Sequence, residues 1–261
     1  MIYDLQKGSM LKRASAFLLD VILLAILSVG FAFLLSGLFG YNKYNTIYSE
    51  GIDRYAAQYG VDFSSVTSQS DYDALSGEQK AAYDAAVDAM NEDEEILMAL
   101  NMICRLIVTM ASVSIFLGYM VIEFIVPLAF GNGQTVGKKI FGLGVMRTSG
   151  VKIRAVSLFA RTFLGKYVVE TMVPVLLIIM MIFGALGIMA GPGILGLVVL
   201  LGLLIAQIVL VSTTKTNSMI HDLVSDCVVV DLASQMIFDD EQKMLDYKTK
   251  KAAEEASQSK Y

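Results

Sequence analysis

The sequence contains no tryptophan and only 3 prolines, 2 cysteines and 1 histidine in 261 residues. Cys104 lies in an apolar run and Cys227 follows more than a hundred residues later, so we expect neither a disulfide framework nor a cysteine-rich metal site. His221 has no second histidine to join it in a metal site, and a polar position where a membrane helix ends explains it. No nucleophile, base and orienting group can be assembled. We therefore expect no enzyme activity, no cofactor and no metal.

Charged residues are also scarce, at 17% of the chain, whereas soluble domains carry about 25%. Hydrophobic residues make up 56%, and the mean hydropathy is +0.62. This composition excludes an ordinary soluble domain. The net charge of -5, from 20 basic and 25 acidic residues, becomes informative only when it is mapped along the chain.

The apolar residues fall into stretches that are long enough to cross a membrane, which takes about 20 helical residues. The stretches are 14–38, 96–130, 167–190 and 192–212. The first is longer than the apolar part of a signal peptide and lacks a clear cleavage site, so we expect it to be retained. The last two form a helical hairpin, broken at Gly191-Pro192-Gly193. We predict an all-α membrane protein with four transmembrane helices.

Lysine and arginine counts orient these helices, because cytoplasmic loops hold an excess of them. The segment 131–166 carries seven basic residues and no acid, whereas 41–95 carries 3 basic and 12 acidic residues. We predict that both termini are cytoplasmic and that 41–95 is extracytoplasmic. The expected organisation is 1–40 with the first span, 41–95 as an acidic cap, 96–130 as the second span, 131–166 as a basic cytoplasmic loop, 167–212 as the hairpin and 213–261 as a cytoplasmic tail.

Two segments outside the spans are expected to be helical. In 41–95, Ser76-Gly77-Glu78-Gln79 fits a capping box at the start of an alanine-rich helix. Its tyrosines indicate either an interfacial aromatic belt or a ligand-binding cap. From Lys152 onward, apolar residues gather on one helical face while Arg154 and Arg161 lie on the other. This pattern predicts an amphipathic helix on the inner leaflet, with its arginines near anionic lipid headgroups.

Charged residues inside a membrane span are rare, because each costs roughly 2.5–3.5 kcal/mol at the centre. Arg105 is explained by a position at the outer interface. Asp20, Glu123 and Glu170 are expected in the inner half of the membrane, where a pair of acids favours a proton or cation site. The alternative is structural: Asp20 and Glu123 bond polar groups across helices or pair with a base such as Arg13.

The segment GNGQTVGKK at 131–139 looks like a phosphate-binding loop but fails on two counts. The spacing from Gly133 to Gly137-Lys138 is one residue short, and Lys139 replaces the required serine or threonine. We therefore expect no nucleotide site, and nothing else in the chain suggests a nucleic-acid partner.

Three residues and one loop resemble the RDD family of bacterial multi-pass membrane proteins. Arg13 and Asp20 lie in LKRASAFLLDVILLAIL at 11–27, the basic loop spans 133–153 and is followed by Arg161, and the second aspartate is Asp222 in MIHDLVSDCVVVD at 219–231. The resemblance implies a family motif of Arg13, Asp20 and Asp222, a location in the bacterial cytoplasmic membrane, and transport of a ligand that is not defined. It also suggests that Arg13 and Asp222 meet.

We therefore hypothesise a small cation- or proton-coupled transporter, or a subunit of one, that uses its intramembrane carboxylates. The alternative is a non-catalytic accessory or scaffold protein that binds a membrane partner. The expected surroundings are a bilayer with an anionic inner leaflet and, since four helices are few for a transport path, a second copy or a partner protein.

Overall fold

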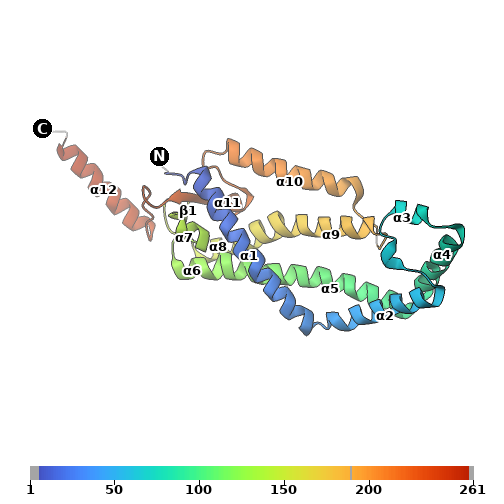
Figure 1. Cartoon of the computed structure of the whole chain (residues 1–261). Helices are drawn as coiled ribbons and strands as arrows, with labels where there is room; N and C mark the ends of the chain where they lie inside the picture. Colours follow the sequence, from blue (N-terminus) through green and yellow to red (C-terminus); the bar gives the residue numbers. More distant parts are fainter. Residues whose placement is uncertain (1–5, 189, 259–261) are drawn as a thin grey trace. The chain divides into compact units, whose positions relative to one another are not determined.

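The computed structural model describes residues 6–188 and 190–258. Within these residues, four helices are long and apolar enough to cross a membrane (Figure 1). They cover Met10–Leu38, Glu94–Phe130, Ala155–Ala185 and Gly193–Thr213. The shortest has 21 residues, which at about 1.5 Å each spans a hydrocarbon core about 30 Å thick. The four predicted membrane helices are therefore present.

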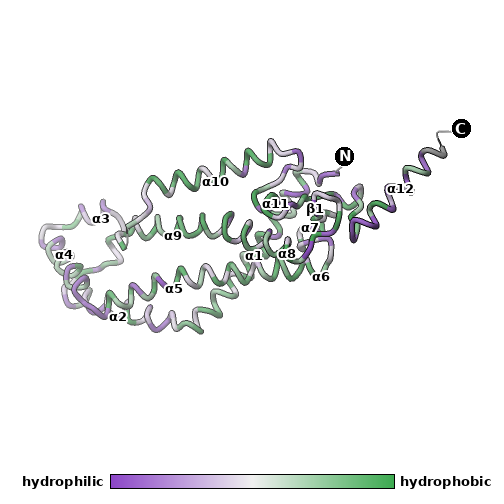
Figure 2. Tube along the Cα trace, turned by 180° about the vertical axis from the view of Figure 1, so that it is seen from behind, coloured by the Kyte–Doolittle hydropathy of each residue, from purple (hydrophilic) through white to green (hydrophobic). Residues whose placement is uncertain are grey.

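Two of the spans contain wider, π-helical segments. The first span is α1 (Met10–Leu38), and the second consists of α5 (Glu94–Tyr119), the π-helical η2 (Met120–Ile125) and α6 (Val126–Phe130). The third consists of α8 (Ala155–Ala160), the π-helical η3 (Arg161–Met172) and α9 (Val173–Ala185), and the fourth is α10 (Gly193–Thr213). Apolar side chains remain exposed along these helices, as a lipid environment requires. Figure 2 shows that hydrophobic residues follow one another along the helices.

The chain forms two compact units, Met1–Phe31 with Ser114–Tyr261 and Ala32–Val113. The second contains α2 (Tyr41–Tyr59), the 3₁₀ turn η1 (Phe63–Ser65), α3 (Gln69–Ala74) and α4 (Gly77–Glu92). The capping box expected at the start of α4 is formed: Ser76 N donates to Gln79 Oε1 at 2.9 Å, and Gln79 N donates to Ser76 Oγ at 3.3 Å. Asp93 accepts hydrogen bonds from Arg54 and Tyr55 and so fastens α2 to the start of α5.

The first unit contains a small sheet that the sequence analysis did not predict. Strand β1 (Leu143–Arg147) pairs antiparallel with β2 (Cys227–Asp231), with Val145 opposite Val229. Both faces of the sheet are buried: Ala16 of α1 packs on one face, and Leu232 and Ile237 pack on the other. A strand buried on both faces reads as a short apolar run without alternation. The expected all-α fold is therefore a mainly helical fold with one two-stranded sheet.

The third span begins earlier than the sequence analysis placed it. We expected a separate interfacial helix from Lys152 and a span over 167–190, but one continuous helix runs from Ala155 to Ala185. Some of the basic residues in its first part do not face lipid headgroups, because Arg161 and Lys166 are buried. These two basic residues thus face protein at η3, and the wide π-helical turns include both of them.

The segment 213–261 is also more than a solvated tail. Its first part forms α11 (Ile220–Val224) and β2, and both contain fully buried residues. Only the later part, α12 (Glu241–Gln258), is an exposed helix, in keeping with its few apolar residues. The ring of Tyr247 contacts Phe238, and Lys152 pairs with Asp239 at 2.6 Å, so the start of α12 is tied to the loop after β1.

Candidate functional site

Charged side chains from five elements of the first unit meet where α1, η2, α7 (Val136–Ile140), η3 and α11 come together. We call this set the ionic cluster. Its members are Arg13, Asp20, Glu123, Lys138, Arg161, Lys166, Glu170, His221 and Asp222. With His221 neutral, four basic and four acidic groups balance. Burial of so many charges is tolerated only when they are paired.

Asp222 binds two arginines. Its Oδ1 accepts from Arg161 Nη2 at 2.7 Å and from Arg161 Nε at 3.1 Å, and its Oδ2 lies 3.5 Å from Arg13 Nη2. The contact expected between Arg13 and Asp222 is thus present, but Arg161 is the closer partner. Burial alone would raise the pKa of the Asp222 carboxyl; the neighbouring His221, Arg161 and Arg13 together hold it below its usual range.

Arg161 does not lie toward lipid headgroups, as its place on the amphipathic pattern predicts; that prediction is wrong. The side chain is 1% exposed and turned into the protein. Its polar position on the helical wheel gave no sign of this, because the acid that faces it lies 61 residues further along the chain. The one usable signal was that Arg161 follows the basic loop in the family pattern.

Asp20 fastens α1 to the basic loop. Its Oδ2 accepts from Thr135 Oγ1 at 2.5 Å, and its Oδ1 accepts from the backbone N–H of Gly137 at 2.8 Å. Thr135 also caps α7 by accepting from Lys138 N. A side chain at Gly137 would collide with the carbonyl oxygen of Ala16, so glycine is required there. The glycine-rich segment that resembles a phosphate loop thus serves to hold an aspartate.

Lys138 lies between Asp20 and Glu123, two of the carboxylates that we expected in the inner half of the membrane. Its Nζ is 3.7 Å from Asp20 Oδ2 and 3.8 Å from Glu123 Oε2. Lys166 Nζ donates to Glu123 Oε1, whereas Glu123 Oε2 is buried and accepts no hydrogen bond within the described parts of the chain. Asp20 and Glu123 are thus neighbours, joined by an ammonium group that the sequence analysis had assigned to a cytoplasmic loop.

Glu170 lies apart from the other two candidate acids and binds His221. Its Oε2 is 2.7 Å from His221 Nδ1, and its Oε1 accepts from the His221 backbone N–H at 3.0 Å. Burial lowers the pKa of His221, although Asp222 and Glu170 oppose this. The histidine that the sequence analysis set aside is therefore a buried link between η3 and α11.

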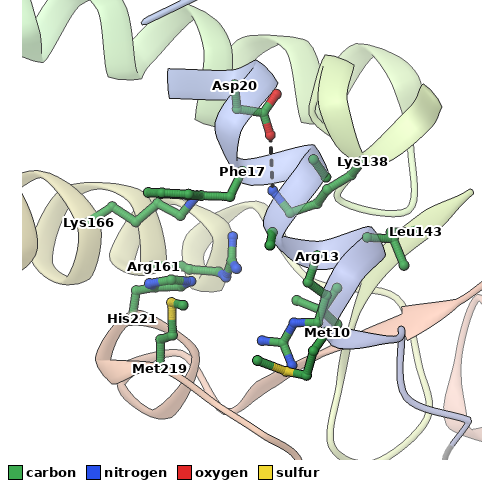
Figure 3. Close-up of a pocket in the computed structure, with 13 residues that line it drawn as sticks. Met10, Arg13, Phe17, Asp20, Lys138, Leu143, Arg161, Lys166, Met219 and His221 are labelled. Carbon is green, nitrogen blue, oxygen red and sulfur yellow. Dashed lines mark ion pairs between the residues drawn. The ribbon is translucent and has the colours of Figure 1, made fainter. Parts of the chain in front are cut away.

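A cavity of about 170 Å³ opens among these side chains (Figure 3). Its charged lining comprises Arg13, Asp20, Lys138, Arg161 and Lys166, and His221 also lines it. Glu123 and Asp222 do not line it. Figure 3 shows Lys138 reaching toward Asp20 from one side, with Lys166 and Arg161 on the opposite side. In residues 6–188 and 190–258, no group of three or more His, Cys, Asp or Glu is arranged to hold a metal ion.

Comparison with known proteins gives one result. The model of the RDD family matches residues 7–226, which include the ionic cluster and strand β1 and end just before β2. Neither a curated protein nor a solved structure matches the chain.

Proposed function

Since the chain belongs to the RDD family and is a multi-pass membrane protein, we propose that it is a small proton- or cation-coupled transporter, or a subunit of one, in the bacterial cytoplasmic membrane. The observation that carries the proposal is the position of Lys138, on the wall of a cavity and between Asp20 and Glu123. Ionisable residues inside membrane proteins are found on proton and ion paths.

The coupling follows from the charge balance around Lys138. Burial lowers the pKa of Lys138 to about 8, and Lys166 and Arg161 add to the shift while Glu123 and Asp20 oppose it. When Lys138 releases its proton, Asp20 and Glu123 lose a counter-charge that they share. A proton or a small cation that is taken up beside these two carboxylates restores the balance. Glu123 Oε2, which accepts no hydrogen bond from the described residues, offers a place for that proton or cation.

We expect Asp20→Asn to abolish proton- or cation-coupled flux while leaving the protein folded. Asparagine keeps the size and can still accept from Gly137 N–H, but it carries no charge to balance against Lys138. The measurement is ion flux in proteoliposomes, with and without a pH gradient. Asp226→Asn, at an exposed position outside the ionic cluster, is the matched control. Undiminished flux in the folded Asp20→Asn protein would refute the proposal, as would a wild-type protein that moves no cation tested.

A second prediction concerns pH. Below pH 8, Lys138 keeps its proton and occupies the place between the carboxylates, and above it the amine is neutral, so flux should rise as the pH passes through about 8. Lys138→Arg keeps a permanent charge there and should give low flux without this rise. Lys139→Arg, at the exposed neighbour, should behave as the wild type. A rise at the same pH in Lys138→Arg would assign the titration to another group.

The proposed orientation has a separate test. Cysteines placed at Ser64 and Lys250, both exposed, should react with an impermeant reagent from opposite sides of the membrane. The native Cys104 and Cys227 are buried and provide the background. Reaction of both introduced cysteines from the outside would overturn the proposal that the termini are cytoplasmic.

One observation favours the accessory or scaffold alternative: Asp20 and Asp222 are fully bonded within the chain. If the cluster only holds the bundle together for a membrane partner or a second copy, Asp20→Asn should be neutral or stabilising, because a buried amide costs less than a buried carboxylate. The flux measurement with Asp20→Asn separates the two functions.

A further inference from the structure

The ionic cluster as a whole has equal numbers of basic and acidic groups, but those of its residues that line the cavity are mostly basic. Among residues 6–188 and 190–258, four basic side chains line the cavity, but only one carboxylate, that of Asp20, does so. Glu123 and Asp222, which balance three of the bases, are not part of the wall. A ligand in the cavity would therefore meet the positive partners of these ion pairs.

Several of these cations also have donors to spare. Lys138 Nζ donates one hydrogen bond, to Thr135 Oγ1 at 3.1 Å, and its nearest carboxylate oxygen is 3.7 Å away. Arg161 Nη1 comes no closer than 4.0 Å to Glu123 Oε2. The two hydrogen bonds from Arg13 measure 3.4 and 3.5 Å. Charge-assisted bonds between nitrogen and oxygen are usually about 2.7–2.9 Å long, so these donors are only loosely satisfied.

The cavity has the size for an oxyanion. Its 170 Å³ equals the volume of roughly five or six water molecules at about 30 Å³ each, which is room for a tetrahedral group. Met10 and Phe17 of α1 also line it, and both are exposed on a helix that crosses the membrane. Apolar side chains thus line the cavity beside its basic residues (Figure 3).

From these observations we infer that the cavity is an anion site that binds a phosphate group, supplied either by free phosphate or by a phospholipid headgroup. Lys138, Arg161 and Arg13 supply the donors. In the headgroup case the acyl chains lie along Phe17. The inference goes beyond the proposed function, because binding is measured without any flux: failure of one leaves the other standing.

Ala14 offers a test that leaves every ion pair intact. It lines the cavity and is exposed, so a longer side chain fits there without displacing a charged residue. Ala14→Glu and Ala14→Gln have nearly the same size and differ in charge. A carboxylate facing a bound phosphate should weaken binding by about tenfold or more, whereas the amide should change it little. Lys139→Gln, which removes a basic charge over the ring of Phe130 outside the cavity, controls for surface charge.

The experiment titrates inorganic phosphate into the full-length protein in nanodiscs of phosphatidylcholine, at constant ionic strength set with chloride, and follows binding by calorimetry. A second arm adds phosphatidylglycerol to the discs and detects retained lipid by native mass spectrometry. We expect saturable phosphate binding in the wild type and in Lys139→Gln, with the loss confined to Ala14→Glu. If phosphatidylglycerol competes with inorganic phosphate, a lipid headgroup is the source of the bound phosphate group. If it does not compete, free phosphate is the source. The inference would be overturned if the wild type bound no phosphate and retained no lipid. It would also be overturned if Ala14→Glu and Ala14→Gln had equal effects.

Discussion

Asp222→Asn is expected to lower the free energy of unfolding by about 3–5 kcal/mol, the usual cost of removing one partner from a buried ion pair. The side chains of Asp222 and Arg161 are each 1% exposed, so the guanidinium would be left without a counter-charge and without water. Arg13 would lose its acid as well. The measurement is denaturant unfolding in detergent micelles. Asp226→Asn, four positions away and exposed, should change stability by no more than about 0.5 kcal/mol.

The same carboxylate predicts how stability depends on pH. Because the pKa of Asp222 is lower in the folded protein than its ordinary value of 3.8, its contribution is present above that value and is lost as the pH falls below it. The wild type should therefore lose more stability on acidification than Asp222→Asn does. If the free energy of unfolding depends on pH in the same way in the wild type and in Asp222→Asn, the ion pair contributes little to stability. The same conclusion follows if Asp222→Asn lowers the free energy of unfolding no more than Asp226→Asn does.

Gly165→Ala should destabilise the protein by about 1–3 kcal/mol or more, because the added methyl has no space. A Cβ at Gly165 would lie 2.5 Å from both the Cα and the Cβ of His221, and the backbone of α11 cannot move aside as a side chain could. The displacement should also break the contact between His221 and Glu170.

Gly202→Ala is the matched control for this substitution. Gly202 lies inside α10, and a Cβ there meets no atom within 4 Å. Alanine is the better helix former by about 1 kcal/mol, so this change should be neutral or stabilising. Thermal unfolding of the two variants side by side checks the opposite signs. A Gly165→Ala protein as stable as Gly202→Ala would mean that α11 does not pack against η3 as closely as described.

The membrane helices could be predicted from the sequence because each is a local pattern. Length and hydropathy alone locate α1 and α10, and the signal for a capping box lies within four residues at Ser76. The contact between Arg13 and Asp222 was also anticipated, but from the family resemblance and the need of a buried arginine for an acid.

The bases of the candidate site were harder to find. Lys138, Arg161 and Lys166 stand in a run of basic residues that the charge rule reads as a cytoplasmic loop. They are buried because they pair with Asp20, Glu123 and Asp222, which lie between 15 and 118 residues away in sequence. Hydrophobic periodicity carries no information about such partners. The two strands could not be predicted for the same reason, since Val145 and Val229 pair across more than eighty residues.

The pairing of Arg13 with Asp222, 209 residues apart, also fixes the order in which the protein can assemble. A ribosome delivers the chain from the N-terminus, so Arg13, Lys138 and Arg161 are all synthesised before the acid that two of them share. Until Asp222 emerges, behind the last of the four spans, Arg13 and Arg161 lack the acid that they share, whereas Asp20 and Glu123, the partners of Lys138, are already in place. The nascent chain therefore cannot close this end of its bundle helix by helix, and completion of the cluster is a post-insertional step that draws the segment after α10 back against α1 and η3.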